Sequence, residues 1–272
     1  MPPIPEDRYA IIIGAMKSGT TSLYSYLAPH PEICPCRTKE PEYFSRREAH
    51  GIHAGRYQEL WDFDPSKHTY VLEASTGYTK FPLERDVPGR MRALGIRPRF
   101  LYIMRDPFER IESHFNTGRF NPDWKRSILD DHLLNVSDYY LQLRQYEDFF
   151  PRDSILLLDF SHLREDPRMV LGEAYRFLGL EEHFPKDFER RNRTEYPSRW
   201  EHLYRKVIAG AGLDRIIPPG LKAKGRKLTE GAKPVRRRKL DPREREIVYH
   251  RLKEGMRALR EEYGFDTGAW GF

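Results

Sequence analysis

The residue types best suited to chemistry lie close to the start of the chain. Residues 14–21 read GAMKSGTT, a small, polar and glycine-bearing run with a single lysine, Lys17. This run follows an apolar stretch at 9–13 and precedes helical spacing at 22–27. Such a loop at the start of a helix turns several backbone N–H groups toward one point. Together with the helix dipole and the Lys17 ammonium, these donors predict an anion site, most naturally for phosphate.

The spacing of this run differs from the phosphate loop of nucleotide hydrolases. In that loop, G-x-x-x-x-G-K-[ST], a lysine directly follows the second glycine. Here Lys17 precedes Gly19 by two residues, and Thr20 stands where the hydrolases have lysine. A nucleotide kinase, which needs that lysine and an acidic magnesium ligand at a strand end, is therefore an alternative and not the prediction. The other alternative is an ordinary strand–helix turn with a solvated lysine.

A second polar set follows the apolar run RFLYIM at residues 99–104. Arg105 comes directly after this run, Asp106 is a suitable helix N-cap and Pro107 a suitable first helical residue. Open parallel sheets bind ligands at the carboxyl ends of their strands. Arg105 and Ser113, eight residues further along the predicted helix, are therefore candidate binding residues. The alternative is a helix cap with a local ion pair.

Apolar runs alternate with stretches of helical spacing, which predicts an α/β fold with a central parallel sheet flanked by helices. The predicted strands are 9–13, 68–74, 99–104 and 154–160. The predicted helices are 22–27, 83–94, 107–118, 138–150, 167–178, 203–213 and 241–264. No internal repeat or low-complexity linker interrupts the pattern, so we expect a single P-loop-like domain over residues 1–272.

Composition limits the class of protein. Aromatic residues make up 13% of the 272 residues, as expected for a folded chain. No apolar run approaches the ~20 residues of a membrane helix, and the first residues lack the features of a signal peptide. We therefore expect no membrane span and a cytoplasmic protein. Cys34 and Cys36 are too close for an easy disulfide and too few for a zinc site, which indicates reduced structural thiols.

The net charge of +6 is concentrated in one segment. Residues 222–239 hold nine lysines and arginines against one acid, Glu230. A local basic segment favours a polyanionic ligand or an acidic acceptor nearby. It lacks the interleaved aromatic residues typical of single-strand binding, so no nucleic-acid partner is expected. A non-catalytic protein that binds polyanions or nucleic acid is an alternative, as is a merely solvated loop.

Two motifs together resemble the sulfotransferase family that uses 3′-phosphoadenosine 5′-phosphosulfate (PAPS). The first is similar to the family's 5′-phosphosulfate loop and comprises Lys17, Ser18, Gly19, Thr20, Thr21 and Ser22. The second, Arg105-Asp106-Pro107 with Ser113, is similar to its 3′-phosphate motif. The run EPEYF at 40–44 and the closing stretch 263–270 look closest to the heparan-sulfate-type branch and its bacterial relatives. The resemblance covers nearly the whole chain.

The resemblance implies transfer of a sulfuryl group from PAPS to a hydroxyl or amine of a carbohydrate, glycolipid or small metabolite. In that reaction Lys17 would neutralise the charge that builds on the oxygen between sulfur and the 5′-phosphate. Arg105 and Ser113 would bind the 3′-phosphate. No metal is implied. Oligomeric state and the choice between O- and N-sulfation stay open.

The resemblance also implies a general base. The branch uses a glutamate just before paired aromatic residues, which matches Glu40 before Tyr43 and Phe44. Partial burial beside these rings would make the carboxylate a better base. The alternative for Glu40 is a structural partner of Lys39. The competing bases are Glu42, His50, His53 and His114.

Three features differ from the glycan-modifying members. Glu73 is followed by Ala74, where those members tend to have a substrate-side lysine. Glu42 stands where the branch often has histidine. Lys224-Gly225-Arg226 resembles the loop that closes over the nucleotide, but about fourteen residues separate it from the last helix. A contact from within 227–238 is therefore the alternative to that loop.

Overall fold

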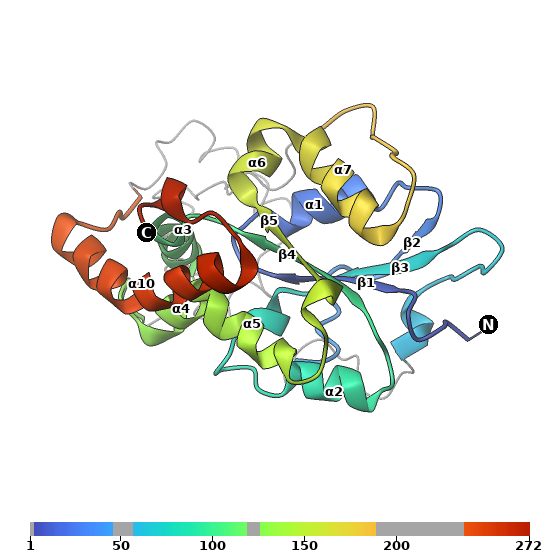
Figure 1. Cartoon of the computed structure of the whole chain (residues 1–272), viewed down its shortest axis with the longest axis horizontal. Coiled ribbons are helices and arrows are strands. Elements are labelled where there is room, and N and C mark those ends of the chain that lie inside the picture. Colours follow the sequence, from blue (N-terminus) through green and yellow to red (C-terminus); the bar gives the residue numbers. More distant parts are fainter. Residues whose placement is uncertain (1–2, 46–56, 119–125, 189–236) are drawn as a thin grey trace, which may run out of the picture.

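The computed structural model describes residues 3–45, 57–118, 126–188 and 237–272. Within these ranges all strands pair in parallel and form one sheet of order β2-β3-β1-β4-β5 (Figure 1). The strands are β1 (Tyr9–Gly14), β2 (Ile33–Pro35), β3 (Tyr70–Ala74), β4 (Arg99–Met104) and β5 (Ile155–Asp159). The chain leaves β1 toward β3 and later returns to β4 on the other side of β1. The carboxyl ends of β1 and β4 therefore form the switch point where such sheets bind ligands.

Helices cover both faces of this sheet (Figure 1). One face carries α1 (Thr20–Leu27), α6 (Phe160–Glu165) and α7 (Pro167–Leu178). The other carries α2 (Val87–Ala93), α3 (Pro107–Gly118), α4 (Asp131–Ser137), α5 (Tyr139–Glu147) and α10 (Pro242–Tyr263). Short 3₁₀ turns occur at Tyr57–Leu60, Thr76–Thr79, Arg152–Ser154 and Gly268–Trp270.

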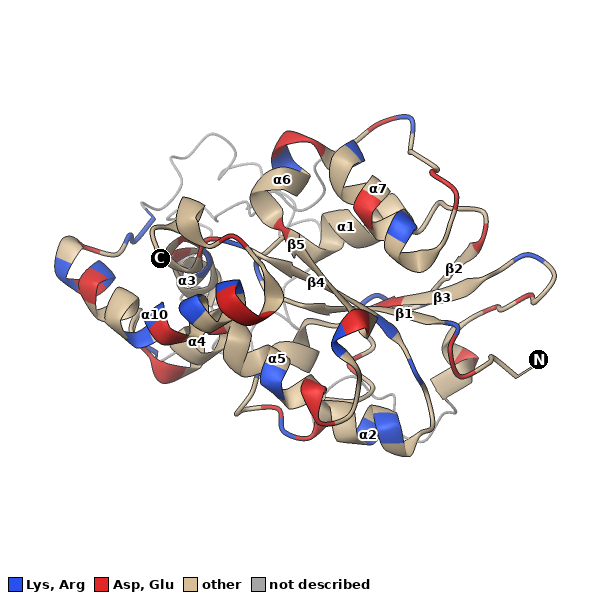
Figure 2. Ribbon diagram, viewed as in Figure 1, with Lys and Arg blue, Asp and Glu red and all other residues tan. Residues whose placement is uncertain are grey.

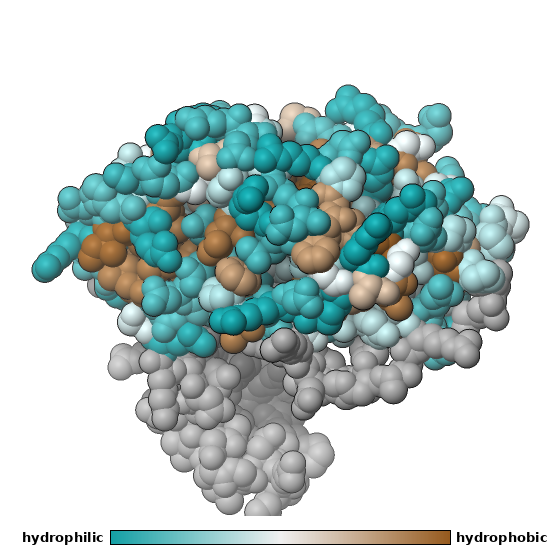
Figure 3. All heavy atoms as spheres, turned by 60° about the horizontal axis from the view of Figure 1, so that its bottom comes forward, coloured by the Kyte–Doolittle hydropathy of each residue, from teal (hydrophilic) through white to brown (hydrophobic). Residues whose placement is uncertain are grey.

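The alternation of side chains along the central strands divides the core in two. Neighbouring strand residues point to opposite faces of a sheet. In β1, Ile11 and Ile13 pack toward α5 and α10, whereas Ala10 and Ile12 pack toward α1 and α7. Charged residues lie mostly on the helices and loops (Figure 2). On the face seen in Figure 3, hydrophilic residues separate the apolar ones.

The last residues of the sequence pack against α3 and α5. The Phe272 ring stacks on Phe108 at 5.3 Å between centroids and on Tyr249 at 5.3 Å. Trp270 meets Tyr139 edge to face at 5.8 Å. These aromatic contacts attach residues 264–272 to the helix that begins at the end of β4.

The structure confirms the predicted parallel α/β fold and its four main strands, within one or two residues at each end. It also confirms α3, α7 and α10, and α10 begins with a capping box in which Asp241 and Glu244 bond reciprocally. The predicted helix 83–94 is shorter and begins at Val87, because Pro88 lies in its first turn, where proline is tolerated. The sequence analysis missed β2, α4 and α6. The predicted helix 203–213 lies outside the described residues.

Candidate active site

The loop between β1 and α1 is compact and held against β4. The Ala15 N–H donates to the Ile103 carbonyl at 2.7 Å, and the Ser18 N–H donates to the Ala15 carbonyl at 3.1 Å. Lys17 and Gly19 have positive φ, 73° and 87°. At Gly19 a side chain would also clash, since a Cβ would lie 2.5 Å from the Phe160 ring. The turn therefore delivers the N-terminus of α1, with its N–H donors, to the carboxyl edge of the sheet.

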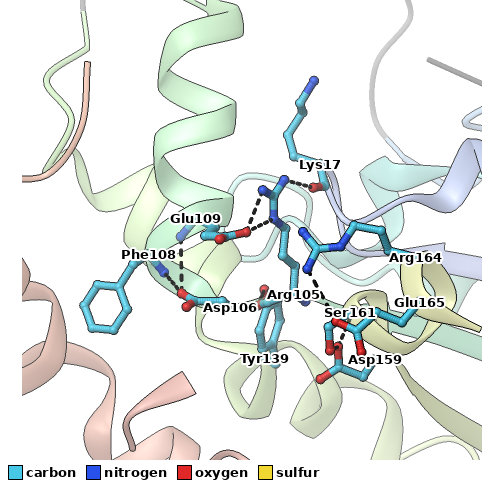
Figure 4. Close-up of polar contacts among 10 residues, drawn as sticks. All are labelled: Lys17, Arg105, Asp106, Phe108, Glu109, Tyr139, Asp159, Ser161, Arg164 and Glu165. Atoms are coloured by element: carbon cyan, nitrogen blue, oxygen red, sulfur yellow. Dashed lines mark hydrogen bonds and ion pairs between the residues drawn. The ribbon is translucent and has the colours of Figure 1, made fainter. Parts of the chain in front are cut away.

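Arg105 lies at the end of β4 beside this loop. Its Nε and Nη2 donate to Glu109 Oε2 at 3.0 and 2.7 Å, and its Nη1 donates to the Lys17 carbonyl at 3.4 Å (Figure 4). The Lys17 side chain extends away from the guanidinium (Figure 4). The carboxylate of Asp106 caps α3 by accepting from the N–H groups of Phe108 and Glu109. The cap and the local ion pair expected as an alternative are thus both present, and Arg105 still faces the cavity.

One cavity of about 1020 Å³ joins the two motifs. Predicted site residues that line it are Lys17, Gly19, Thr20, Thr21, Ser22, Glu40, Arg105 and Ser113. The predicted Ser18 is fully buried and does not line this cavity. Residues that line it without having been predicted include Lys39, Glu112, Asn116, Phe160, Arg164 and Lys239. The fold therefore brings together stretches that are more than 80 residues apart in sequence.

Positive charge dominates this cavity. Six cationic side chains line it against three acidic ones, Glu40, Glu109 and Glu112. Burial, and then the charges of Arg105 and Arg110, lower the pKa of Lys17, whereas Glu40 raises it. A bound anion would offset this mutual repulsion, so the electrostatics favour a ligand with several negative charges.

Arg110 is a candidate that the sequence analysis did not single out. Its guanidinium is fully buried and donates to the Met16 carbonyl at 3.3 Å, the Leu133 carbonyl at 2.9 Å and Ser137 Oγ at 2.6 Å. Burial lowers its pKa to about 10. Arg110 therefore links the back of the Lys17 loop to α3 and α4. The available signal was its place on the buried stripe of α3, four residues before His114.

Glu40 reaches the cavity from the segment after β2. Its Oε1 accepts from Lys39 Nζ at 2.9 Å, as expected for the structural alternative, but the carboxyl group also lines the cavity. The Glu40 side chain keeps 38% exposure. Glu40 is thus accessible to a bound ligand.

The competing bases lie elsewhere. Glu42 is buried, and its carboxylate accepts from the Gly77 N–H and Ser45 Oγ, each at 2.9 Å. His114 is buried against Arg110, and burial lowers its pKa well below the usual range. Neither side chain lines the cavity. His50 and His53 lie outside the described residues.

The predicted nucleotide-closing residues Lys224, Gly225 and Arg226 also lie outside the described residues. The described end of the basic segment 222–239 borders the cavity through Arg237 and Lys239. Between them, Arg238 turns toward α10 and donates to Glu244 Oε1 at 2.5 Å. The Asn116 side chain holds this stretch by bonding both the carbonyl and the N–H of Arg238, at 2.7 and 2.8 Å.

Three further features concern the described part of the chain. No group of three or more His, Cys, Asp or Glu side chains there could hold a metal ion. None of the helices in that part is both long and apolar enough to cross a bilayer. Cys34 and Cys36 are buried and not bonded to each other.

Comparison with known protein families decides the assignment. The family described as "Sulfotransferase domain" matches residues 7–194, which is more than half of the chain and includes both phosphate motifs. The chain belongs to the sulfotransferase family. The family resemblance inferred from the two motifs is therefore confirmed.

Similar proteins include two whose names refer to heparan sulfate. The sulfotransferase is 27% identical over 200 residues to the bifunctional heparan sulfate N-deacetylase/N-sulfotransferase 3 of Mus musculus, covering 64% of this chain and 22% of the relative. It is 27% identical over 188 residues to the human heparan sulfate glucosamine 3-O-sulfotransferase 3B1, covering 63% of this chain and 46% of the relative. The chain thus spans less than half the length of these relatives.

A solved structure has the same fold. The sulfotransferase from Alicyclobacillus acidocaldarius superposes with a TM-score of 0.67 at 19% identity, over 99% of this chain and 100% of that one. At this identity the likeness concerns the fold alone, which is a parallel sheet flanked by helices.

Proposed function

We propose that this sulfotransferase transfers a sulfuryl group from PAPS to a hydroxyl or amine of a carbohydrate, glycolipid or small-metabolite acceptor. The observation that carries the proposal is the shared cavity, in which Lys17, Glu40 and Arg105 meet from three separate stretches of sequence. The names of the relatives, which act on heparan sulfate, support a glycan among the possible acceptors.

The residues of the cavity fit the two anionic ends of PAPS. The N–H groups at the start of α1 and the Lys17 ammonium suit the 5′-phosphosulfate. Arg105 offers a planar fork and Ser113 a hydroxyl donor to the 3′-phosphate. The Glu109 carboxylate now occupies the Arg105 fork, and it is 51% exposed. An exposed ion pair of this kind contributes about 0–1 kcal/mol, so a phosphate dianion can displace Glu109 at little cost.

The proposed mechanism is an in-line displacement at sulfur. Glu40 accepts the proton as the acceptor oxygen or nitrogen forms its bond to sulfur. The bond between sulfur and the bridging oxygen breaks, and the Lys17 ammonium neutralises the negative charge left on the 5′-phosphate. Little covalent work remains for the protein beyond holding donor and acceptor in line.

Calorimetric titration with PAP, the desulfated product, tests the donor site. We expect micromolar binding to the wild type and no binding of ATP with magnesium. Lys17→Ala and Arg105→Ala should each weaken PAP binding about tenfold or more, because a charge-assisted hydrogen bond contributes about 1.5–3 kcal/mol. Lys67→Ala is the matched control, since Lys67 is exposed and pairs with Asp64 outside the cavity.

The Glu40→Gln variant tests the base. It should keep the PAP affinity of the wild type and lose about 10²–10⁴-fold in turnover. Absence of PAP binding, or tighter binding of ATP, would contradict the proposal and leave the basic segment 222–239 as the best guide to a ligand.

A further inference from the structure

A buried carboxylate, that of Glu73, precedes the residues that bond to the segment 40–44, which we call the Glu40 segment. Glu73 occupies a core-facing position in β3, is fully buried and does not line the cavity. Three hydroxyl groups donate to it. Ser75 Oγ and Tyr78 OH donate to Oε1 at 2.7 and 2.5 Å, and Tyr57 OH donates to Oε2. A carboxylate in the core is costly unless its oxygens are satisfied, and these hydroxyls satisfy them.

Two of these hydroxyls also hold the Glu40 segment. Ser75 Oγ accepts from the Glu42 N–H at 3.0 Å, and Tyr78 OH accepts from the Phe44 N–H at 3.3 Å. A hydroxyl has one proton and two lone pairs. In its ionised form Glu73 can only accept, so each hydroxyl donates its hydrogen bond to the carboxylate and keeps its lone pairs for the backbone N–H groups.

A third bond completes the attachment. The Glu40 N–H donates to the Ala74 carbonyl at 3.1 Å. Alternate residues of the segment, Glu40, Glu42 and Phe44, are therefore all bonded to the stretch that follows Glu73 in the chain.

The segment needs this support because its backbone is strained. Glu40 and Glu42 have φ of 55° and 51°, in the left-handed region that residues with a Cβ avoid. Such conformations persist where the surrounding structure enforces them. Gly77 contributes as well, since a Cβ there would lie 1.8 Å from Glu42 Oε2.

We propose that Glu73 is a positioning residue for Glu40: its carboxylate orients the Ser75 and Tyr78 hydroxyls, which hold the strained segment so that the Glu40 carboxylate faces the cavity. The proposal rests on the function proposed above, because the role of Glu40 as base belongs to that function.

The test compares Ser75→Ala and Tyr78→Phe with Tyr57→Phe. Tyr57 is the matched control, because its hydroxyl donates to the same carboxylate while the N–H groups of Glu42 and Phe44 bond to Ser75 and Tyr78. Hydrogen exchange of the amides at 40–44 should be at least tenfold faster in Ser75→Ala and Tyr78→Phe and within twofold of the wild type in Tyr57→Phe. The Kd for PAP should stay within twofold in all three variants.

Turnover provides a second readout. With PAPS and a desulfated, N-deacetylated heparan oligosaccharide, which offers both hydroxyls and amines, Ser75→Ala and Tyr78→Phe should lose at least tenfold in kcat with an unchanged KM for PAPS. Added to Glu40→Gln, the same substitutions should cause no further loss, because residues that act through one group are not additive.

Several results would overturn the proposal. These are amide exchange and turnover in Ser75→Ala and Tyr78→Phe equal to those of Tyr57→Phe, full additivity with Glu40→Gln, or a parallel loss of PAP affinity. A Glu40→Gln variant with unchanged turnover would instead refute the base in the proposed function. The amide exchange result, which reports on how the Ser75 and Tyr78 hydroxyls hold residues 40–44, would then stand on its own.

Discussion

Burial shifts the pKa values of two residues, Lys17 and Glu73, in opposite directions. It lowers the pKa of Lys17, where Arg105 and Arg110 add like charge, and it raises the pKa of Glu73 to about 7. Each shift disfavours the charged form. An anion in the cavity would reverse the shift of Lys17, whereas the environment of Glu73 belongs to the fold itself.

The raised pKa of Glu73 predicts a specific pH dependence of stability. The ordinary value is 4.5, so between pH 4.5 and 7 the folded protein holds a proton that the unfolded chain has released. This proton stabilises the folded state. The contribution of Glu73 to the free energy of unfolding is complete below pH 4.5 and is lost as the pH rises through 7, at about 1.4 kcal/mol per pH unit. The hydroxyls of Tyr57 and Tyr78 limit this shift, and the Glu42 carboxylate increases it.

Urea unfolding of the wild type and Glu73→Gln at pH 4.5 and 8 measures this effect. The free energy of unfolding of the wild type, relative to that of the variant, should fall by about 3 kcal/mol between the two pH values. The exposed Glu261 serves as control, since Glu261→Gln should show no such change. An equal difference at both pH values would contradict the assignment.

Single site residues can be predicted from the sequence where their immediate neighbours in the chain identify them. Lys17, Arg105 and Ser113 stand at recognisable distances from strand ends and glycines, and Glu40 stands before paired aromatic residues. Arg110 and Glu73 escape such reasoning, because a charged residue in a helix or strand is expected to face solvent. Only the packing of several elements shows that these two are buried.

Among the elements, α3 organises the side of the cavity that holds Arg105. Arg105 and the Asp106 cap directly precede its first turn, and its last turn carries Asn116, which holds the backbone of Arg238. The Glu112 carboxylate accepts from the Leu240 N–H at 3.0 Å and strengthens the same attachment. One helix therefore aligns two cationic stretches along the cavity.

This arrangement predicts different effects for neighbouring cations. Arg237→Gln and Lys239→Gln should each weaken PAP binding several-fold, because both side chains border the cavity. Arg238→Gln removes the same charge one residue away but on the side of α10, so the Kd for PAP should change less than twofold. Calorimetry with PAP and with adenosine 5′-monophosphate, which has no 3′-phosphate, shows which of the two phosphates each cation affects. Equal losses for all three variants would indicate a merely diffuse charge effect.

The shortest helices and strands are the hardest to predict from the sequence. The strands β1, β3, β4 and β5 are five or six residues long and mostly apolar, so their composition identifies them. β2 has three residues, one of them proline, and α4 and α6 have seven and six. A helix of two turns is too short for a 3.6-residue period to emerge. Tertiary packing stabilises these elements instead.

In the molecule as a whole, the C-terminal helix belongs to the same core as the sheet. Val248, Leu252, Met256 and Leu259 of α10 are fully buried in the cluster that contains Phe100. The family match ends at residue 194. Side chains of α10 nevertheless pack in the same core cluster as one face of the sheet. We therefore propose that residues 1–272 form one domain.

Truncation of the chain tests whether residues 1–272 form one domain. A fragment of residues 1–194 loses the four buried apolar side chains of α10 and also those of Leu240 and Trp270. At about 1.5–3 kcal/mol each, the four from α10 alone match the usual stability of a domain, about 5–15 kcal/mol. We expect the fragment to lack a cooperative thermal transition by circular dichroism, whereas Leu252→Ala in the full chain should melt cooperatively at a lower temperature. A fragment that melts like the full chain would contradict the proposal.

The stacking of Phe272 between Phe108 and Tyr249 also matters for protein engineering. Tyr139, which contacts Trp270, donates to the Arg105 carbonyl at 2.5 Å, so the final residues support the backbone of Arg105. Chimeras between sulfotransferases that exchange residues 99–118 should therefore exchange residues 264–272 from the same parent. A crossover that separates these two stretches would join residues 99–118 from one lineage to a support that evolved for another.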